Sequence, residues 1–255
     1  MDMLFSGLAP SLFALALGVA LLAGVIKGVV GFAMPMVMIS GLGSFMAPEL
    51  ALAGLILPTL VTNGMQALRQ GLAMAWASIR RFRLFLVIGL VMLVGSAQLV
   101  TLLPASVMLL LIGVPVTFFA VLQLLGWTLS LDGPRRGAEA AIGAFAGFIG
   151  GISGVWGPPT VAYLTAINTP KSEQMRVQGV IYGLGALALF GAHIQSGVMR
   201  AETAPFSAAM IVPAVLGMWL GTMIQDRLDQ AVFRKVTLWV LLIAGANLIR
   251  RGLMG

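Results

Sequence analysis

A serine and a histidine form the only pattern in the sequence that could support covalent chemistry. Ser153 lies in the tetrapeptide Gly151–Gly154, and the single histidine follows at position 193. A serine nucleophile needs a base within hydrogen-bonding reach, so Ser153 and His193 could serve an intramembrane serine hydrolase. The motif is short and therefore weak evidence. The Gly-Pro-Pro sequence at residues 157–159 also suits the start of a helix better than a catalytic turn.

A second set of residues could bind an anion. Lys27 and His193 lie inside apolar segments, whereas the eight acidic residues fall at segment ends or in loops. A carrier of cations, or a proton pump, usually places a carboxylate near the middle of the membrane. The charged chemistry within the segments is therefore cationic and favours an anionic ligand. The alternative for Lys27 is a side chain that reaches to the membrane surface.

Polar side chains also recur at helical spacing on one face of the segment 50–68. The stripe continues just past the segment end and contains Thr59, Thr62, Asn63, Gln66 and Gln70. The amide groups of Asn63 and Gln66 could donate hydrogen bonds to an oxyanion, and Gln178 offers the same group on the segment 177–198. Such a stripe could equally hold helices together.

These residues must be positioned by membrane-spanning helices. The chain of 255 residues is 60% hydrophobic and only 9% charged, where a soluble domain has roughly a quarter of its residues charged. We expect an all-α polytopic membrane protein with about eight spans. No basic cluster lies in a segment large enough to fold outside the bilayer, which excludes nucleic acid as a partner, and the absence of cysteine excludes disulfides. The expected apolar segments are 8–42, 50–68, 84–103, 107–131, 138–167, 177–198, 204–224 and 232–249.

The first and fifth of these segments are too long for one straight helix, and they match each other. Residues 24–37 (GVIKGVVGFAMPMV) align without a gap on residues 147–160 (GFIGGISGVWGPPT). Three glycines and one proline coincide, and Val30 stands where the later copy has Ser153, which weakens the hydrolase interpretation. We therefore predict two homologous halves, 1–131 and 132–255. Chance similarity between glycine-rich membrane helices is the alternative.

The matched prolines predict a broken helix in each half. Proline is favoured in the first turn of a helix, so new half-helices should start near Met34–Pro35 and near Gly157–Pro158. Each start leaves backbone N–H groups unpaired at the positive end of a helix dipole. Paired breaks of this kind form anion sites near the midplane of secondary transporters. The plainer alternative is that these glycines and prolines only kink and pack helices, as Gly217 and Gly221 should do.

The charge pattern leaves the topology open. Arg69 and the arginines at 80–83 should be cytoplasmic. If each long segment crosses once, there are eight passes, and the basic residues at 227–235 fall outside. If each long segment folds back or crosses twice, the halves are inverted repeats, and those residues fall inside.

The matched segments resemble the sulfite exporter TauE/SafE family, also called the toluene sulfonate uptake permeases. In the first half the resemblance rests on GVVGFAMPMV and APELALAGLILPTLVTN, and in the second on GGISGVWGPPTVAYL and KSEQMRVQGVIYG. It covers nearly the whole chain and includes Tyr163 and Arg176. The family motif is closer to Gly-x-Gly-Gly-Pro-Pro, so Trp156 is a departure that could narrow the site or stack on an aromatic substrate.

The resemblance implies a secondary carrier for sulfite or organosulfonates, without ATP or another cofactor, in the inner membrane. We expect alternating access, with the anion held between the two half-helix starts. A passive anion channel is the alternative within transport. Coupling to protons or other ions and a homodimeric assembly are left open. The expected substrate-binding residues are Lys27, Gly31, Pro35, Asn63, Gln66, Gly154, Trp156, Gly157, Pro158, Pro159, Tyr163, Arg176, Gln178 and His193.

Overall fold

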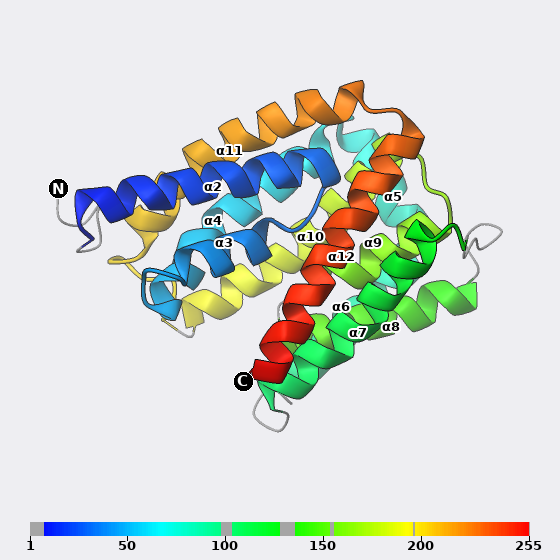
Figure 1. Cartoon of the computed structure of the whole chain (residues 1–255), viewed down its shortest axis with the longest axis horizontal. Coiled ribbons are helices and arrows are strands. Elements are labelled where there is room, and N and C mark those ends of the chain that lie inside the picture. The colour runs from blue at the N-terminus through cyan, green and yellow to red at the C-terminus, as the bar shows by residue number, and fades with distance from the viewer. Residues whose placement is uncertain (1–7, 98–103, 128–135, 154–155, 196, 255) are drawn as a thin grey trace. The chain divides into compact units, whose positions relative to one another are not determined.

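The computed structural model describes residues 8–97, 104–127, 136–153, 156–195 and 197–254, and within them it contains helices joined by turns and no strands. Figure 1 shows the helices in chain order. They are α2 (Pro10–Val30), α3 (Met34–Leu42), α4 (Pro48–Leu68), α5 (Leu72–Arg81), α6 (Arg83–Ala97), α7 (Ala105–Leu124), α8 (Arg136–Ser153), α9 (Gly157–Ala166), α10 (Lys171–Gln195), α11 (Ala204–Arg227) and α12 (Gln230–Met254).

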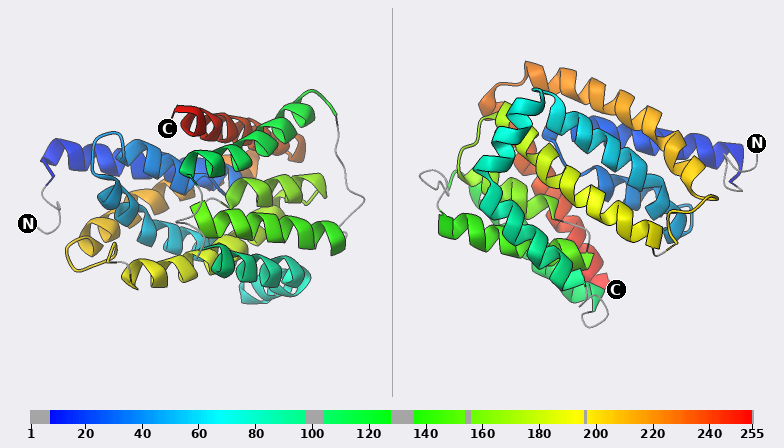
Figure 2. Two further views of the ribbon diagram at one scale, coloured as in Figure 1. Left: turned by 90° about the horizontal axis from the view of Figure 1, so that it is seen from below. Right: turned by 180° about the vertical axis from the view of Figure 1, so that it is seen from behind.

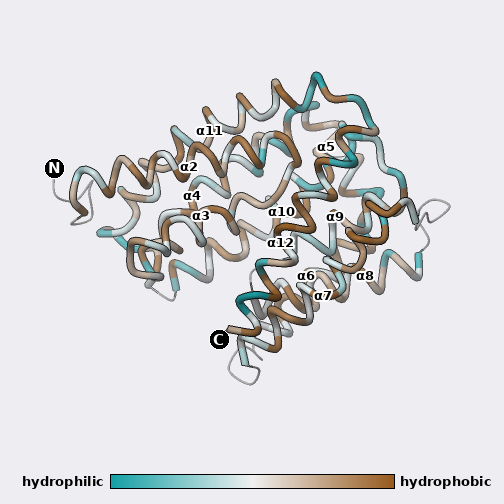
Figure 3. Tube along the Cα trace, viewed as in Figure 1, coloured by the Kyte–Doolittle hydropathy of each residue, from teal (hydrophilic) through white to brown (hydrophobic). Residues whose placement is uncertain are grey.

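Five of these helices are long and apolar enough to cross a membrane, namely α2, α4, α10, α11 and α12. Figure 3 shows their predominantly hydrophobic colouring and the hydrophilic stretches near several helix ends. Shorter apolar stretches lie in α6 and α7. The structure therefore confirms the all-α class, whereas the number of eight spans stays a prediction.

The first and fifth apolar segments are each interrupted, as the glycines and prolines predicted. α2 is followed by the short helix α3, and α8 is followed by the short helix α9. The sequence did not predict α5, which fills the connection between the second and third segments.

The helices pack into two compact units, and each unit takes helices from both predicted halves. Unit 1 contains residues 1–71 and 178–228, and unit 2 contains residues 72–177 and 229–255. Helix α10 contributes its first residues to unit 2 and the remainder to unit 1. The packing units do not test the repeat boundary at residues 131–132, which stays a prediction.

In unit 1, α2 and α11 lie side by side and run in the same direction (Figures 1 and 2). Their contact is made by glycines. A side chain at Gly24 would meet the backbone of Ala214, and a side chain at Gly28 would meet Gly221 further along α11. Gly217 and Gly221 approach the backbone of α2 in turn, so their predicted packing role is confirmed.

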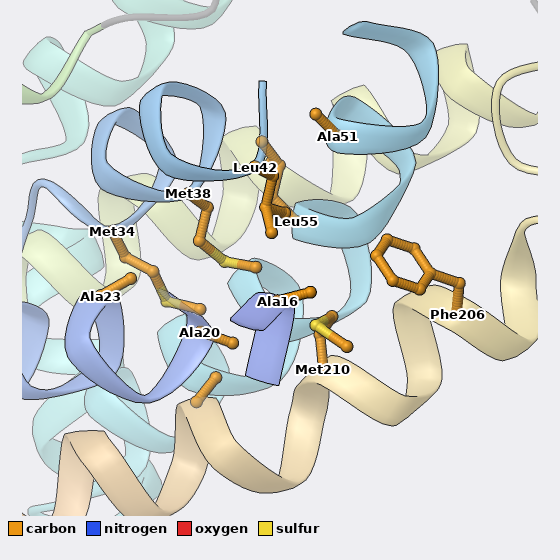
Figure 4. Packing of buried hydrophobic residues seen from close by; sticks show 11 residues of the cluster. Ala16, Ala20, Ala23, Met34, Met38, Leu42, Ala51, Leu55, Phe206 and Met210 are labelled. Carbon is orange, nitrogen blue, oxygen red and sulfur yellow. The ribbon is translucent and has the colours of Figure 1, made fainter. Parts of the chain in front are cut away.

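Helix α3 folds back along α2. Its residue Gly41 lies against the side chain of Val19, far before the end of α2. With nine residues, α3 is about 14 Å long, less than half of the roughly 30 Å hydrocarbon layer. Its inward residues Met34, Met38 and Leu42 join a fully buried cluster with alanines of α2 and with Phe206 and Met210 of α11 (Figure 4).

Unit 2 has a similar pair in α6 and α8. Gly147 approaches the backbone of Gly89, and Gly143 approaches Phe85, so these two helices also run in the same direction. Tyr163, late in α9, stacks on Phe85. Because Phe85 lies beside the early part of α8, α9 returns along α8 as α3 returns along α2.

Helices α7 and α12 form the other close pair of unit 2, and they run in opposite directions. Gly113 lies against Gly245, whereas Gly252 lies against Ser106 and Leu110 nearer the start of α7. The matched glycines Gly24 and Gly147 thus both serve close helix packing. At Gly24 and Gly147 the alternative interpretation, that the glycines only pack helices, is therefore correct. The breaks themselves depend on other residues.

We predict that Gly24→Leu destabilises the protein by about 1–3 kcal/mol, because a leucine there would collide with the α11 backbone. Gly18 on the same helix is the matched control, since a side chain at Gly18 meets nothing within 4 Å. Thermal unfolding in detergent should show a lower midpoint for Gly24→Leu and little change for Gly18→Leu. Equal midpoints for the two variants would contradict this packing.

Candidate functional site

The break in unit 1 contains two residues with a positive φ, Gly31 and Ala33. Gly31 ends α2 with φ of 85°, a left-handed conformation that favours glycine, and its N–H donates to the Lys27 carbonyl at 2.6 Å. Ala33 also has a positive φ of 71°, which is unfavourable for a residue with a side chain. Met34 then begins α3 with Pro35 in its first turn, so the predicted start is confirmed.

Lys27 lies in the last turn of α2 and is buried, with 2% of its surface exposed. Its Nζ donates a hydrogen bond to Oδ1 of Asn63 on α4. Among the ion pairs of the described residues, none includes Lys27. A buried cation is normally paired with an anion, because isolated burial of a charge is unfavourable by several kcal/mol. The neutral amide of Asn63 accepts one hydrogen bond from the Lys27 side chain and supplies no countercharge.

The polar stripe of α4 faces this break. Gln66 is buried and its Nε2 donates to the carbonyl of Gly31 at 3.1 Å, which holds α4 against the end of α2. Thr62 is fully buried one turn earlier and donates to the Pro58 carbonyl of its own helix. The structure therefore brings together Lys27, Gly31, Asn63 and Gln66, which the sequence analysis selected separately.

Helix α10 closes this part of unit 1 through small residues. A side chain at Gly179 would meet the backbone of Gln66 and Ala67, and Gly183 lies beside Asn63. Gln178, another predicted site residue, is fully buried next to Gly179. Because Gly179 lies near Gln66 while Gly183 lies near the earlier residue Asn63, α10 runs opposite to α4.

The break in unit 2 begins a second half-helix. α9 starts at Gly157, as predicted, with Pro158 and Pro159 in its first turn. Trp156 precedes it, and its indole occupies the space that a side chain at Gly150 would need, within 3 Å. The carbonyl of Trp156 accepts a hydrogen bond from the Thr160 hydroxyl at 2.9 Å. Gly154 lies outside the described residues, and Ser153 is the last residue of α8.

Tyr163 is buried in unit 2 and has an unsatisfied hydroxyl. The ring stacks on Phe85 with centroids 6.1 Å apart, and 2% of the residue is exposed. Within the described part of the chain, the Tyr163 hydroxyl has no hydrogen-bond partner. An unpartnered buried hydroxyl is unfavourable, so this group is available to a ligand or to water.

Arg176 takes part in a polar network of unit 2. Its Nε donates to the Ser78 hydroxyl at 2.7 Å, which ties α10 to α5. Nearby in the chain, Glu173 pairs with Arg81 at 2.5 Å. These contacts give Arg176 a structural role in this conformation, and its predicted role in substrate binding stays untested. His193 lies half-buried in the last turn of α10, where its carbonyl accepts from Met199 N–H.

Two polar residues of unit 2 with structural roles were not predicted from the sequence. Glu139, buried in the first turn of α8, accepts a hydrogen bond from the N–H of Phe85 at 3.2 Å and so caps the start of α6. Ser78 was missed because α5 was read as a connection. Glu139 could have been noticed as an acidic residue next to an apolar run, although its partner lies far away in the sequence.

The unit 1 group consists of hydrogen-bond donors whose role in anion binding stays a prediction. It combines a buried ammonium with two side-chain amides and a half-helix start. Within the residues described, no cluster of His, Asp or Glu could hold a metal ion.

Comparison with known proteins identifies a family. No curated protein and no solved structure is similar enough to the chain to match. The model of one protein family, described as sulfite exporter TauE/SafE, matches residues 16–248. The match spans both breaks and almost every helix. The chain is therefore a member of the sulfite exporter TauE/SafE family of membrane transport proteins.

Proposed function

We propose that this protein is a secondary transporter of sulfur-containing anions, and that Lys27 binds the anion at the break between α2 and α3. The observation that carries the proposal is the burial of the Lys27 ammonium beside a neutral amide, without a carboxylate. A bound anion would supply the missing countercharge. Family membership supports sulfite and related sulfur anions as the substrate class.

Two other arginines of unit 1 are already engaged by carboxylates. Arg69 and Arg200 form exposed ion pairs with Asp226 and Glu49. Their carboxylate partners are therefore engaged at the helix ends. The start of α9 in unit 2 offers the same kind of N–H donors as the start of α3, and its part in substrate binding stays a prediction.

Helix directions support inverted repeats and hence alternating access. In the predicted repeat, α4 corresponds to α10 and α7 corresponds to α12. Each of these pairs is antiparallel, as the glycine contacts show. Parallel repeats would require the matched helices to run the same way, whereas inverted repeats require opposite directions. In the same repeat, α2 corresponds to α8 and α6 corresponds to α11. The close parallel pair α2–α11 of unit 1 is therefore the counterpart of the close parallel pair α8–α6 of unit 2.

The fold-back of α3 and α9 would also improve the agreement with the positive-inside rule, leaving only Arg200, Arg250 and Arg251 on the outer side. In unit 1, Arg69 binds Asp226, which precedes Arg227. In unit 2, Arg81 pairs with Glu173, and the N–H of Lys171 donates to Gln230 at the start of α12. Within each unit, the residues from the range 227–235 therefore lie at the same end of the helices as the arginines of the first half. We propose that these ends face the cytoplasm of a cell whose inner membrane holds the protein.

Experiments can distinguish a carrier from the two alternatives, a serine hydrolase and a passive channel. A serine hydrolase should be labelled by a fluorophosphonate at Ser153, and the label should vanish in Ser153→Ala. A passive channel should give uptake into proteoliposomes that does not saturate with substrate. No described contact favours either alternative over a carrier.

We predict that Asn63→Asp lowers the affinity for sulfonates by about tenfold or more, because the new carboxylate would neutralise Lys27 from within the protein. Coupling energies of close charge pairs are about 1.5–7 kcal/mol, which supports this magnitude. Isothermal titration with toluene sulfonate measures it. The control is Asn247→Asp in unit 2, where the amide oxygen accepts from Arg250 at 3.0 Å. Unchanged affinity in Asn63→Asp would place the anion elsewhere.

We predict that single cysteines at positions 70 and 228 are labelled from one side of the membrane, and a cysteine at 202 from the other. The chain has no natural cysteine, so each label is unambiguous. Eight simple passes would instead put positions 70 and 202 on one side and 228 on the other. That second pattern, measured with an impermeant maleimide on intact cells and on inverted vesicles, would rule out the inverted topology.

A further inference from the structure

Helix α5 presents one face to the protein and a different face to its surroundings. The buried residues on or just after this helix are Ala75, Ser78 and Phe82. Leu72 and Trp76 follow each other at four-residue spacing, with 76% and 54% of their surfaces exposed. The exposed Arg80 continues the same stripe one turn later. The outward stripe of α5 therefore combines large apolar side chains with a positive charge.

Two contacts within unit 2 hold α5 in this orientation. The hydroxyl of Ser78 accepts a hydrogen bond from Arg176, and Arg81 pairs with Glu173. Both partners lie in the first turns of α10. The helix is thus fastened to α10, and the stripe of Leu72, Trp76 and Arg80 stays uncovered by the described part of the chain.

The basic residues of the stripe lack a countercharge. Arg80 and its exposed neighbour Arg83, at the start of α6, take part in none of the ion pairs found among the described residues, whereas Arg81 has its carboxylate. The guanidinium carbon of Arg80 lies 5.5 Å from the centroid of the Trp76 ring. This contact attracts the cation to the ring but supplies no negative charge. Both arginines can therefore bind an external anion.

The place of α5 in the chain indicates which anion it meets. The helix joins the candidate span α4 to the apolar helix α6. Its ten residues are about 15 Å long, too short to cross a hydrocarbon layer of roughly 30 Å. Short amphipathic helices with tryptophan and arginine typically lie at the membrane surface, where apolar side chains enter the lipid and basic ones meet anionic headgroups.

We propose that the stripe of α5 is a binding site for an anionic phospholipid such as phosphatidylglycerol. Arg80 and Arg83 bind the phosphate, and the acyl chains lie against Leu72 and Trp76. A lipid matches both parts of the stripe, because one molecule carries the negative charge and the apolar chains together. The inference goes beyond anion transport and does not depend on the site at Lys27.

Native mass spectrometry of the purified full-length protein, with added phosphatidylglycerol or phosphatidylcholine, measures the dissociation constant of each lipid. Attraction to an anionic surface is about 1 kcal/mol per basic residue, which corresponds to about fivefold. We expect phosphatidylglycerol to bind at least about tenfold more tightly, and Arg80→Gln/Arg83→Gln to lose most of this preference. Equal binding of the two lipids to the unsubstituted protein would overturn the proposal.

Matched variants separate the site from a general effect of charge. Arg250→Gln/Arg251→Gln removes two other exposed arginines of unit 2 and should keep the preference. Trp76→Ala should weaken the binding of both lipids and also keep the preference. An equal loss in the two double variants, or unchanged lipid binding in Trp76→Ala, would contradict the site.

Competition experiments distinguish the lipid from other anions. Inorganic phosphate at the same concentration should not displace phosphatidylglycerol, because it cannot contact Leu72 and Trp76. Displacement by phosphate would show that a free anion occupies the stripe. Binding of polyglutamate in place of either lipid would instead indicate a docking surface for an acidic protein. Either result would overturn the lipid assignment.

Discussion

A buried positive charge at the end of α2 is the constraint around which unit 1 is arranged. Lys27 is buried, its side chain contacts Asn63 of α4, and the adjacent Gly28 packs against α11. Asn63 supplies one acceptor for the ammonium, and Gln66 fixes the carbonyl of Gly31 beside it. A group this polar persists inside an apolar bundle only when its partners compensate the lost hydration. Asn63 is a neutral partner of Lys27. In the function that we propose, the bound anion is the charged partner.

Around the break that holds Lys27, some glycines allow close helix packing and another ends the helix. Gly24 and Gly28 let α11 approach α2 closely, and Gly179 does the same for α10 and α4. These contacts hold the surrounding helices at short distance without large side chains, as is typical of membrane bundles. Gly31 alone adopts the left-handed conformation that ends α2. Rigid packing on all sides thus supports a short irregular stretch of backbone, which a membrane protein tolerates only when it is buried in protein or lines a cavity.

Local rules predicted the helix breaks well. Proline in the first turn and glycine after the last turn act over a few residues, so the starts at Met34 and Gly157 could be read directly from the sequence. The polar face of α4 was also readable, because helical spacing alone places Thr62, Asn63 and Gln66 together. The resemblance to the TauE/SafE family followed from the same two motifs.

Contacts between residues that are distant in the sequence could not be predicted from such local rules. The sequence could not separate the packing glycine Gly24 from the capping glycine Gly31, since both occur in one motif. It left open whether α3 continues or reverses, because direction depends on the contact between Gly41 and Val19. It also could not pair Lys27 with Asn63 or Arg176 with Ser78, which are distant in the chain. Helix α5 was missed because ten residues with two arginines between apolar segments resemble a loop.

The central claim is that an anion compensates Lys27, and anomalous diffraction from crystals grown with 4-bromobenzenesulfonate tests it most directly. The bromine signal locates the ligand without ambiguity, and the attached sulfonate shows which group binds it. We predict a sulfonate oxygen within hydrogen-bonding distance of Lys27 Nζ at the break between α2 and α3. A ligand bound elsewhere, with Lys27 still in contact only with Asn63, would contradict the account.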